Sequence, residues 1–253
     1  MYIAPRFERA NPKMMLRKRF HQFISVPVFM LLYAYTMIAV LFVVLFSYIK
    51  WKKTTYLILG VWAKSVFPIM GKRLHITGRE NVSEGRDYIL LANHSSLFDI
   101  MAIMAFYPGV SWFGRDKLLK IPLFGKMLLM TGYIPMRLAS LRNTREMVDQ
   151  LVKKSEGRTV AIFPEGTRTL NGKLSPFYRG FIYLLRATNK DILPVTLNGF
   201  FHLKPKNRFF IDFHSRLEVI IHPSISGAEL STLNDKEIIN TVKTIIASAS
   251  NET

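Results

Sequence analysis

A histidine and an aspartate five positions apart offer the clearest chemistry in this sequence. His94 follows an apolar run, residues 88–92, that we expect to be a buried strand, and Asp99 lies in the first turn of an expected helix, residues 98–106. One helical turn rises about 5.4 Å, so the carboxylate can reach back to the imidazole. Such a carboxylate fixes the ring tautomer and leaves the second nitrogen free to take a proton. A surface histidine beside a helix N-terminal aspartate is the alternative, because the helix dipole favours that carboxylate in any case.

A second set of polar side chains follows another apolar run. Residues 159–163 are expected to form a buried strand, and the chain then continues through Gly166, Thr167 and Arg168. Glycine permits a tight turn and a close approach of the backbone to a ligand. Threonine can donate to an anion, and the planar guanidinium of arginine suits a phosphate. An ordinary turn with solvated charges is the alternative, but this loop leaves a strand end, as His94 does, so the two segments could share one rim.

Apolar runs alternate with helical patterns from residue 72 onwards, and these elements must position both segments. Alternation of this kind is typical of an α/β fold with a mixed, largely parallel sheet flanked by helices. The expected strands are residues 74–77, 88–92, 110–113, 132–136, 159–163 and 192–197. The expected helices include residues 98–106, a segment between Asn143 and Gly157, one around residues 177–185 and a last one from Asn234. We also expect a hairpin in which residues 209–213 and 217–221 close around Ser215.

The composition narrows the possible function classes. Lys and Arg number 35, Asp and Glu number 17, and the formal net charge is +18. Such a surplus indicates an anionic partner, which is nucleic acid, an anionic membrane surface or a phosphorylated substrate. The chain has no cysteine, which excludes disulfides, a thiol nucleophile and cysteine-based zinc sites. The histidines show no metal-ligand spacing, so we expect no metal site.

A long uncharged segment near the N-terminus predicts membrane insertion. Residues 22–49 contain no Asp, Glu, Lys or Arg, and residues 29–46 are almost wholly apolar. About 20 apolar residues span a bilayer, and a buried soluble helix is rarely apolar around its whole circumference. A signal peptide fits less well, because the apolar stretch is too long and no small-residue cleavage site follows it.

The topology of this segment stays open. Both of its flanks are basic, so the positive-inside rule does not set an orientation. A second apolar stretch, residues 56–70, allows a helix pair lodged in one leaflet as the alternative to a crossing. We therefore divide the chain into an N-terminal basic segment with membrane-anchoring helices, residues 1–71, and an α/β domain, residues 72–253.

Together, the two polar segments resemble a known family. Residues 93–99, with a His and an Asp separated by four residues, resemble the first signature of the glycerolipid acyltransferases, and residues 163–168 resemble the third. Over roughly residues 70–200, the chain is similar to bacterial 1-acylglycerol-3-phosphate acyltransferases. The His–Asp motif alone is a weak pattern, whereas its pairing with Glu-Gly-Thr-Arg is specific.

Two further arginines stand near family positions. In residues 132–138, which are similar to the second signature, Leu138 replaces the usual arginine and Arg137 stands one position earlier. In residues 112–118, Arg115 takes the place of a lysine that the family usually carries. Both arginines are further candidates for binding phosphate.

The resemblance implies transfer of a fatty acyl group from a thioester to the 2-hydroxyl of lysophosphatidic acid, giving phosphatidic acid in phospholipid biosynthesis. His94, oriented by Asp99, would act as general base on the hydroxyl and then protonate the leaving thiolate. Ser95 and Ser96 suggest a serine nucleophile, but Gly-x-Ser-x-Gly is absent and direct transfer is simpler. Backbone N–H groups at the start of the helix after His94 are the expected oxyanion donors.

The resemblance also implies the binding groups and partners. Arg168, Thr167 and the Gly166 amide would hold the glycerol phosphate, and Glu165 would orient Arg168 or the glycerol. No cofactor is implied, and the co-substrate is acyl-CoA or acyl carrier protein. The expected partners are membrane lipid, lysophosphatidic acid and the thioester donor, without nucleic acid. The expected location is the inner membrane, with the site on the cytoplasmic side.

Several alternatives remain open at this point. The acceptor could be another lysophospholipid or glycerol-3-phosphate. Water could replace the acceptor hydroxyl in a lipid hydrolase, and a non-catalytic lipid-binding member of the fold is also conceivable. A membrane-anchored nucleic-acid-binding protein would share the basic charge, but the sequence has no recognised nucleic-acid motif and the apolar segment would be unexplained.

Overall fold

Strand β2 (Tyr88–Ala92) lies at the centre of the fold because it is apolar on both of its faces. Side chains along a strand alternate between the two faces of the sheet. Leu90 and Ala92 accordingly belong to one hydrophobic core, and Ile89 and Leu91 belong to the other. A strand that is buried on both faces is typical of a largely parallel sheet covered by helices on both sides.

The computed structural model of the protein describes residues 12–136 and 144–251. Within these residues, one 7-stranded sheet has the order β1-β7-β6-β2-β5-β3-β4. Strands β6 and β7 pair antiparallel, and the other neighbours pair parallel, which confirms the expected mixed, largely parallel sheet. The other strands are β1 (Leu74–Thr77), β3 (Ser111–Arg115), β4 (Ile134–Met136), β5 (Val160–Ile162), β6 (Asp191–Asn198) and β7 (Leu217–Ile221).

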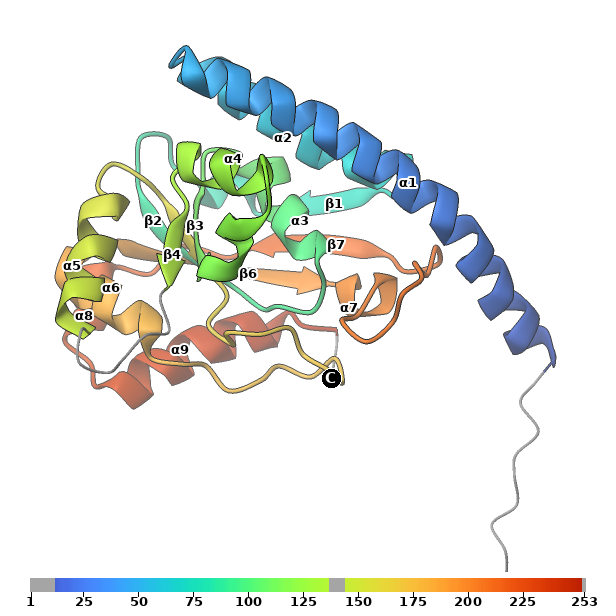
Figure 1. Ribbon diagram of the computed structural model, residues 1–253. Coiled ribbons are helices and arrows are strands. Elements are labelled where there is room, and N and C mark those ends of the chain that lie inside the picture. Colours follow the sequence, from blue (N-terminus) through green and yellow to red (C-terminus); the bar gives the residue numbers. More distant parts are fainter. Residues whose placement is uncertain (1–11, 137–143, 252–253) are drawn as a thin grey trace, which may run out of the picture.

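Helices cover both faces of the sheet, as Figure 1 shows. One core contains side chains from α1 (Pro12–Tyr48), α2 (Lys52–Ile69), α3 (Phe98–Phe106) and α4 (Phe124–Met130). The opposite core contains side chains from α5 (Thr144–Ser155), α6 (Gly180–Thr188), α8 (Gly227–Ser231) and α9 (Asp235–Ser248). Shorter helical turns are η1 (Arg79–Asn81), η2 (Asp116–Lys120) and α7 (Phe200–Leu203). The expected start of α5 at Asn143 lies outside the described residues.

Both N-terminal apolar stretches are helical, and the two helices pack on each other (Figure 1). Polar side chains join them: Trp62 Nε1 donates to Thr36 Oγ1 at 3.1 Å, and the hydroxyl groups of Tyr35 and Ser65 lie 2.7 Å apart. Helix α2 in turn packs on α3, which carries Asp99. In the described residues, α1 contains the one segment, Met15–Tyr48, whose length and apolar composition would allow it to cross a membrane.

The expected hairpin of residues 209–213 and 217–221 is wrong. Only the second run is a strand, and β7 pairs with β6 on one side and β1 on the other. Residues 209–213 form a loop that lies against α1, where the Ile211 N–H donates to Ser25 Oγ at 2.9 Å. The Ile211 side chain is fully buried although its segment is not a strand. The apolar pattern of this loop therefore reflects packing on a helix that is distant in sequence.

Candidate active site

The two polar segments meet at one edge of the sheet. Strands β2 and β5 are parallel neighbours, with Leu91 opposite Ile162, so the residues that follow them leave the sheet side by side. A backbone hydrogen bond joins the two loops directly, because the Thr169 N–H donates to the His94 carbonyl at 2.8 Å. This edge, at the carboxyl ends of parallel strands, is where open α/β sheets bind ligands. The expectation of a shared rim is confirmed.

His94 and Asp99 form a hydrogen-bonded pair. Nδ1 of His94 lies 2.8 Å from Oδ2 of Asp99. The side chain of Asp99 is fully buried, whereas that of His94 is 16% exposed. An ionised carboxylate only accepts hydrogen bonds, so Nδ1 carries the proton and Nε2 has a free lone pair. The pair can therefore accept a proton at Nε2 from a group at the rim.

Backbone N–H groups of the turn before α3 also bind the Asp99 carboxylate. Its Oδ2 also accepts hydrogen bonds from the N–H groups of Ser95 at 2.7 Å and Ser96 at 2.8 Å. These contacts close the turn between β2 and α3 and place the carboxylate under the imidazole of His94. These two amides are committed to Asp99 and are not free to hold an oxyanion, which leaves the N–H groups at the start of α3 itself as the expected donors.

The two serines beside His94 are buried in the turn. Ser95 is 1% exposed and Ser96 is fully buried. The Ser96 hydroxyl donates to the carbonyl of Lys204 at 2.7 Å, which ties this turn to the loop after α7. Neither hydroxyl lies at the open rim, in agreement with a reaction that needs no serine nucleophile.

An aromatic stack supports the imidazole from one side. The rings of His94 and Phe163 are nearly parallel, at an angle of 9°, with their centroids 3.9 Å apart. Trp112, in β3, stacks on the other side of Phe163 at 5.4 Å. Sequence reasoning missed both aromatic residues. Phe163 directly follows β5, so its position at the active edge was the signal that could have identified it.

Glu165 holds the turn that contains His94 by hydrogen bonds to the backbone. Its Oε1 accepts the N–H of His94 at 2.7 Å, and its Oε2 accepts the N–H of Ser175 at 2.9 Å. Burial raises the pKa of this carboxyl group, and the two backbone donors oppose that effect without cancelling it. The residue is only 2% exposed. Both carboxylate oxygens of Glu165 thus accept backbone amides, and the residue positions the turn that contains His94, a role that the sequence did not predict.

The loop after Glu165 turns back toward solvent at Gly166. This glycine has φ +66°, a left-handed conformation that side chains disfavour, and a Cβ there would lie 3.3 Å from the Tyr178 ring. The turn exposes Thr167, and Arg168 is half-buried. Thr167 Oγ1 lies 3.5 Å from the ammonium group of Lys206. The loop therefore brings hydroxyl and cationic groups to the same rim as His94.

Lys204 and Lys206 add positive charge that sequence reasoning missed. Both lie in the loop after α7, far from the motif that contains Arg168. Burial lowers the pKa of Lys204, and the positive charges of Arg168 and Arg208 lower it further. A lysine whose pKa is depressed by other cations would gain from an anion placed among them. No local motif marks these lysines, since only the path of the chain brings them to the site.

Arg115 and Arg137 are the remaining two arginine candidates. Arg115 lies along the same edge of the sheet, and Arg137 lies outside the described residues. Arg115 is the last residue of β3, and its backbone pairs with Met136 of the parallel strand β4. The structure does not describe the side chain of Arg115. For both arginines, phosphate binding therefore stays a prediction.

Comparisons with known proteins point to one enzyme family. An acyltransferase family model matches residues 73–198. The 1-acyl-sn-glycerol-3-phosphate acyltransferase of Borreliella burgdorferi is 31% identical over 182 residues, which are 69% of this chain and 70% of that protein. The chloroplastic enzyme of Brassica napus is 30% identical over 200 residues, 77% of this chain.

The chain is shorter than its plant relatives and shares its fold with a solved bacterial acyltransferase. The chain spans 57% of the length of the Brassica napus relative and 54% of a chloroplastic relative from Arabidopsis thaliana. The crystal structure of the 1-acyl-sn-glycerophosphate acyltransferase of Thermotoga maritima has the same fold, with a TM-score of 0.78 and 24% identity. That similarity covers 90% of this chain and 95% of the other.

Proposed function

The chain belongs to the 1-acyl-sn-glycerol-3-phosphate acyltransferase family, and from this we propose that it transfers a fatty acyl group to the 2-hydroxyl of lysophosphatidic acid. The observation that carries the proposal is the pairing of a general base with a cationic rim. The buried Asp99 holds His94 at the edge of the sheet, and Arg168 and Lys206 stand on the adjoining loops. Lysophosphatidic acid carries both a hydroxyl, from which His94 can take a proton, and a phosphate, which the cationic side chains can bind.

The reaction follows from these side chains as a direct transfer. Nε2 of His94 takes the hydroxyl proton while the hydroxyl oxygen attacks the thioester carbonyl carbon. The tetrahedral intermediate then collapses, the carbon–sulfur bond breaks, and the proton on His94 passes to the leaving thiolate. The products are phosphatidic acid and a free thiol. Asp99 stabilises the imidazolium that exists between the two proton transfers, because its carboxylate already accepts Nδ1–H.

The acceptor phosphate is placed at the rim formed by Arg168, Lys204 and Lys206. Arg168 offers two parallel N–H donors, which suit the oxygens of a phosphate. Thr167 supplies a hydroxyl 3.5 Å from the Lys206 ammonium, so the two groups can bind one anion together. Positive charge here also favours a donor with phosphate groups, and we propose acyl-CoA or acyl carrier protein as that thioester donor.

Replacing Arg168 with alanine is expected to raise the KM for lysophosphatidic acid about tenfold to a hundredfold, the range that loss of a hydrogen bond to a charged group implies. The value of kcat should change far less, because the phosphate is held alike before and during transfer. Initial rates at varied acceptor concentration measure the split. Arg79→Ala is a matched control, since Arg79 follows β1 at the opposite edge of the sheet. An unchanged KM in Arg168→Ala would place the phosphate elsewhere.

The outward side of α1 supports membrane association. While Leu32, Val40 and Val43 are buried, Leu31 and Leu41 are 56% and 53% exposed. Exposed apolar surface of this extent on one helix is unfavourable in water and favourable in lipid. We propose that this face anchors the protein in the inner membrane, with the active site on the cytoplasmic side, where thioester donors are found.

The double substitution Leu31→Asp and Leu41→Asp is expected to release the protein from lipid vesicles. An aspartate at the centre of a membrane helix costs about 2.5–3.5 kcal/mol. Sedimentation with vesicles of phosphatidylethanolamine and phosphatidylglycerol measures binding. Tyr183→Asp, at an exposed position on α6 across the sheet, is the control and should sediment like the wild type. Equal sedimentation of all three proteins would show that another surface holds the membrane.

The function itself is tested by acyl transfer with purified protein in detergent. The acceptors are lysophosphatidic acid, glycerol-3-phosphate and lysophosphatidylethanolamine, each supplied with acyl-CoA and with acyl carrier protein. Phosphatidic acid formed from lysophosphatidic acid alone is the expected result. Free fatty acid with every acceptor would indicate a hydrolase, and the absence of turnover with every pair would contradict the proposed enzyme.

A further inference from the structure

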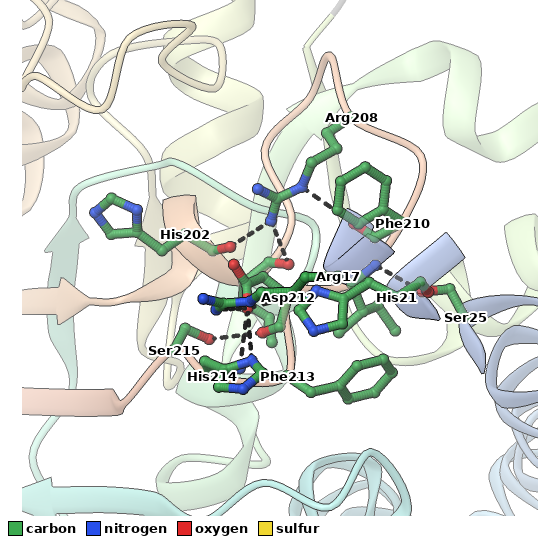
Figure 2. A network of polar contacts seen from close by, with 12 residues as sticks. Arg17, His21, Ser25, His202, Arg208, Phe210, Asp212, Phe213, His214 and Ser215 are labelled. Atoms are coloured by element: carbon green, nitrogen blue, oxygen red, sulfur yellow. Dashed lines mark hydrogen bonds and ion pairs between the residues drawn. The ribbon is translucent and has the colours of Figure 1, made fainter. Parts of the chain in front are cut away.

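A second polar cluster lies away from the active site, where α1 meets the loop between α7 and β7. His21 comes from α1, and Asp212 and His214 come from the loop. One ligand atom of each residue, a ring nitrogen of each histidine and a carboxylate oxygen of Asp212, lies within 4.8 Å of the other two. Figure 2 shows the three side chains converging, while His202 points away from them.

The imidazole of His21 is buried without a hydrogen-bonding partner in the described part of the chain. The residue is 2% exposed, and its Nε2 has no partner there. Its Nδ1 lies 3.8 Å from Oδ1 of Asp212, which is too far for a hydrogen bond. The aromatic rings of Phe213 and Phe210 pack against the imidazole, with centroids at 5.7 and 6.3 Å. Nδ1, the nitrogen that faces the carboxylate, is therefore without a hydrogen bond to it, and a buried polar atom in this state indicates a bound ion or water between the two groups.

We propose that His21, Asp212 and His214 bind a Zn²⁺ ion. Oδ1 of Asp212 lies 3.4 Å from Nδ1 of His214 and 3.8 Å from Nδ1 of His21. Tetrahedral zinc with bonds of about 2.0–2.1 Å places neighbouring ligand atoms roughly 3.3–3.4 Å apart. These two separations are therefore at or above the zinc value and longer than those between hydrogen-bonded atoms, and the three ligand atoms, which lie within 4.8 Å of one another, need to draw together when the ion binds. Two imidazoles and one carboxylate select a transition metal over Ca²⁺ or Mg²⁺, and water takes the fourth position.

The neighbouring cations set limits on this site. Arg17 Nη2 lies 3.6 Å from Oδ1 of Asp212, but its side chain is 52% exposed and can move into solvent. Lys72 and Arg208 also face the cluster, and their charged groups donate to backbone carbonyls, Phe213 O at 3.0 Å and Leu203 O at 2.8 Å. These positive charges weaken the binding of a cation. Two groups contact the ligand oxygen itself, the Arg17 guanidinium and the His214 N–H, which donates to Oδ1 at 3.0 Å.

The cluster lies between α1 and the loop after α7, so a bound ion would hold these two segments together. The same loop carries Lys204 and Lys206 to the active-site rim, and its Ile211 N–H donates to Ser25 of α1. An ion bound to His21 on one side and to Asp212 and His214 on the other would join α1 to this loop. Binding to the folded state alone raises stability, so zinc should raise the melting temperature of the protein.

The test uses the full chain in detergent, without a histidine tag, after removal of metal with EDTA. Equilibrium dialysis with Zn²⁺ measures stoichiometry and affinity, and Co²⁺ substitution reports tetrahedral coordination in the visible spectrum. His214→Asn is the main variant, because the His214 side chain is 63% exposed and its replacement spares the fold. His202→Asn is the matched control, since His202 is exposed and outside the cluster (Figure 2).

The wild type and His202→Asn are expected to bind one equivalent of zinc with the same affinity. His214→Asn and Asp212→Asn should each lose at least the roughly tenfold that removal of an outer-shell partner costs. Arg17→Ala should bind more tightly, because the competing guanidinium is gone. Zinc should raise the melting temperature of the wild type and not that of His214→Asn. Absence of saturable binding by the wild type, or equal binding by wild type and His214→Asn, would overturn the proposal.

Discussion

Replacing His94 with alanine is expected to lower kcat for acyl transfer by roughly 10²–10⁴, the usual contribution of a positioned general acid–base group. The variant loses the acceptor for the hydroxyl proton and the donor for the leaving thiolate in one change. The KM for lysophosphatidic acid should stay close to that of the wild type, because the change leaves intact the proposed phosphate site at Arg168 and the lysines of the neighbouring loop. Steady-state rates with saturating thioester donor measure both constants.

The His94→Ala result needs a control for folding, because the imidazole stacks on Phe163. Thermal unfolding followed by circular dichroism should show a modest decrease in melting temperature, as the imidazole is partly exposed at the rim. His75→Ala, at an exposed position in β1, is the matched histidine control and should keep full activity. Activity of His94→Ala within a few-fold of the wild type would remove this residue from the mechanism.

Replacing Asp99 with asparagine is expected to have an effect of similar size, about 10²–10⁴ in kcat. All three N–H groups that contact the carboxylate bind its Oδ2, so an asparagine oxygen in that place still accepts the N–H groups of Ser95 and Ser96 and Nδ1–H of His94. The turn and the tautomer are then kept, but the neutral amide no longer stabilises the imidazolium that forms when His94 takes the substrate proton. The variant therefore removes the negative charge and leaves the geometry in place.

Comparison with Asp99→Ala separates the two roles of this carboxylate. Alanine leaves two buried N–H groups without an acceptor, which costs about 1–3 kcal/mol for each group. Asp99→Ala should therefore unfold at a clearly lower temperature than Asp99→Asn, although both lose activity. Thermal unfolding and initial rates on the same preparations measure this. Full activity in Asp99→Asn would show that the negative charge of Asp99 is not needed for transfer.

Local patterns predicted much of the fold. The runs at residues 74–77, 88–92 and 98–106 form β1, β2 and α3 with the expected boundaries. The last helix begins at Asn234, where its side chain and that of Glu237 form a capping box. Each of these elements depends on periodicity or on a cap within a few residues, so the information lies in the segment itself.

The candidate site was predicted where its parts are close in sequence. The pairing of His94 with Asp99 depends on the five-residue spacing between a strand end and a helix start, and the structure has it. The contacts of Glu165 were not foreseen, because its partners are backbone amides of His94 and Ser175 in other segments. The use of the Ser95 and Ser96 amides by Asp99 was not foreseen either, since it depends on how the turn between β2 and α3 closes.

The sequence by itself determined most strands of the sheet, the His94–Asp99 pair and the cationic loop after β5, because periodicity and short motifs act within single segments. Only the tertiary structure decided which distant residues join them. The loop after α7 brings Lys204 and Lys206 to the rim. The spacing of the histidines in the sequence gave no sign that His21 would lie near Asp212. Such contacts depend on how complete helices and strands pack, and packing brings together side chains whose spacing in the sequence carries no signal.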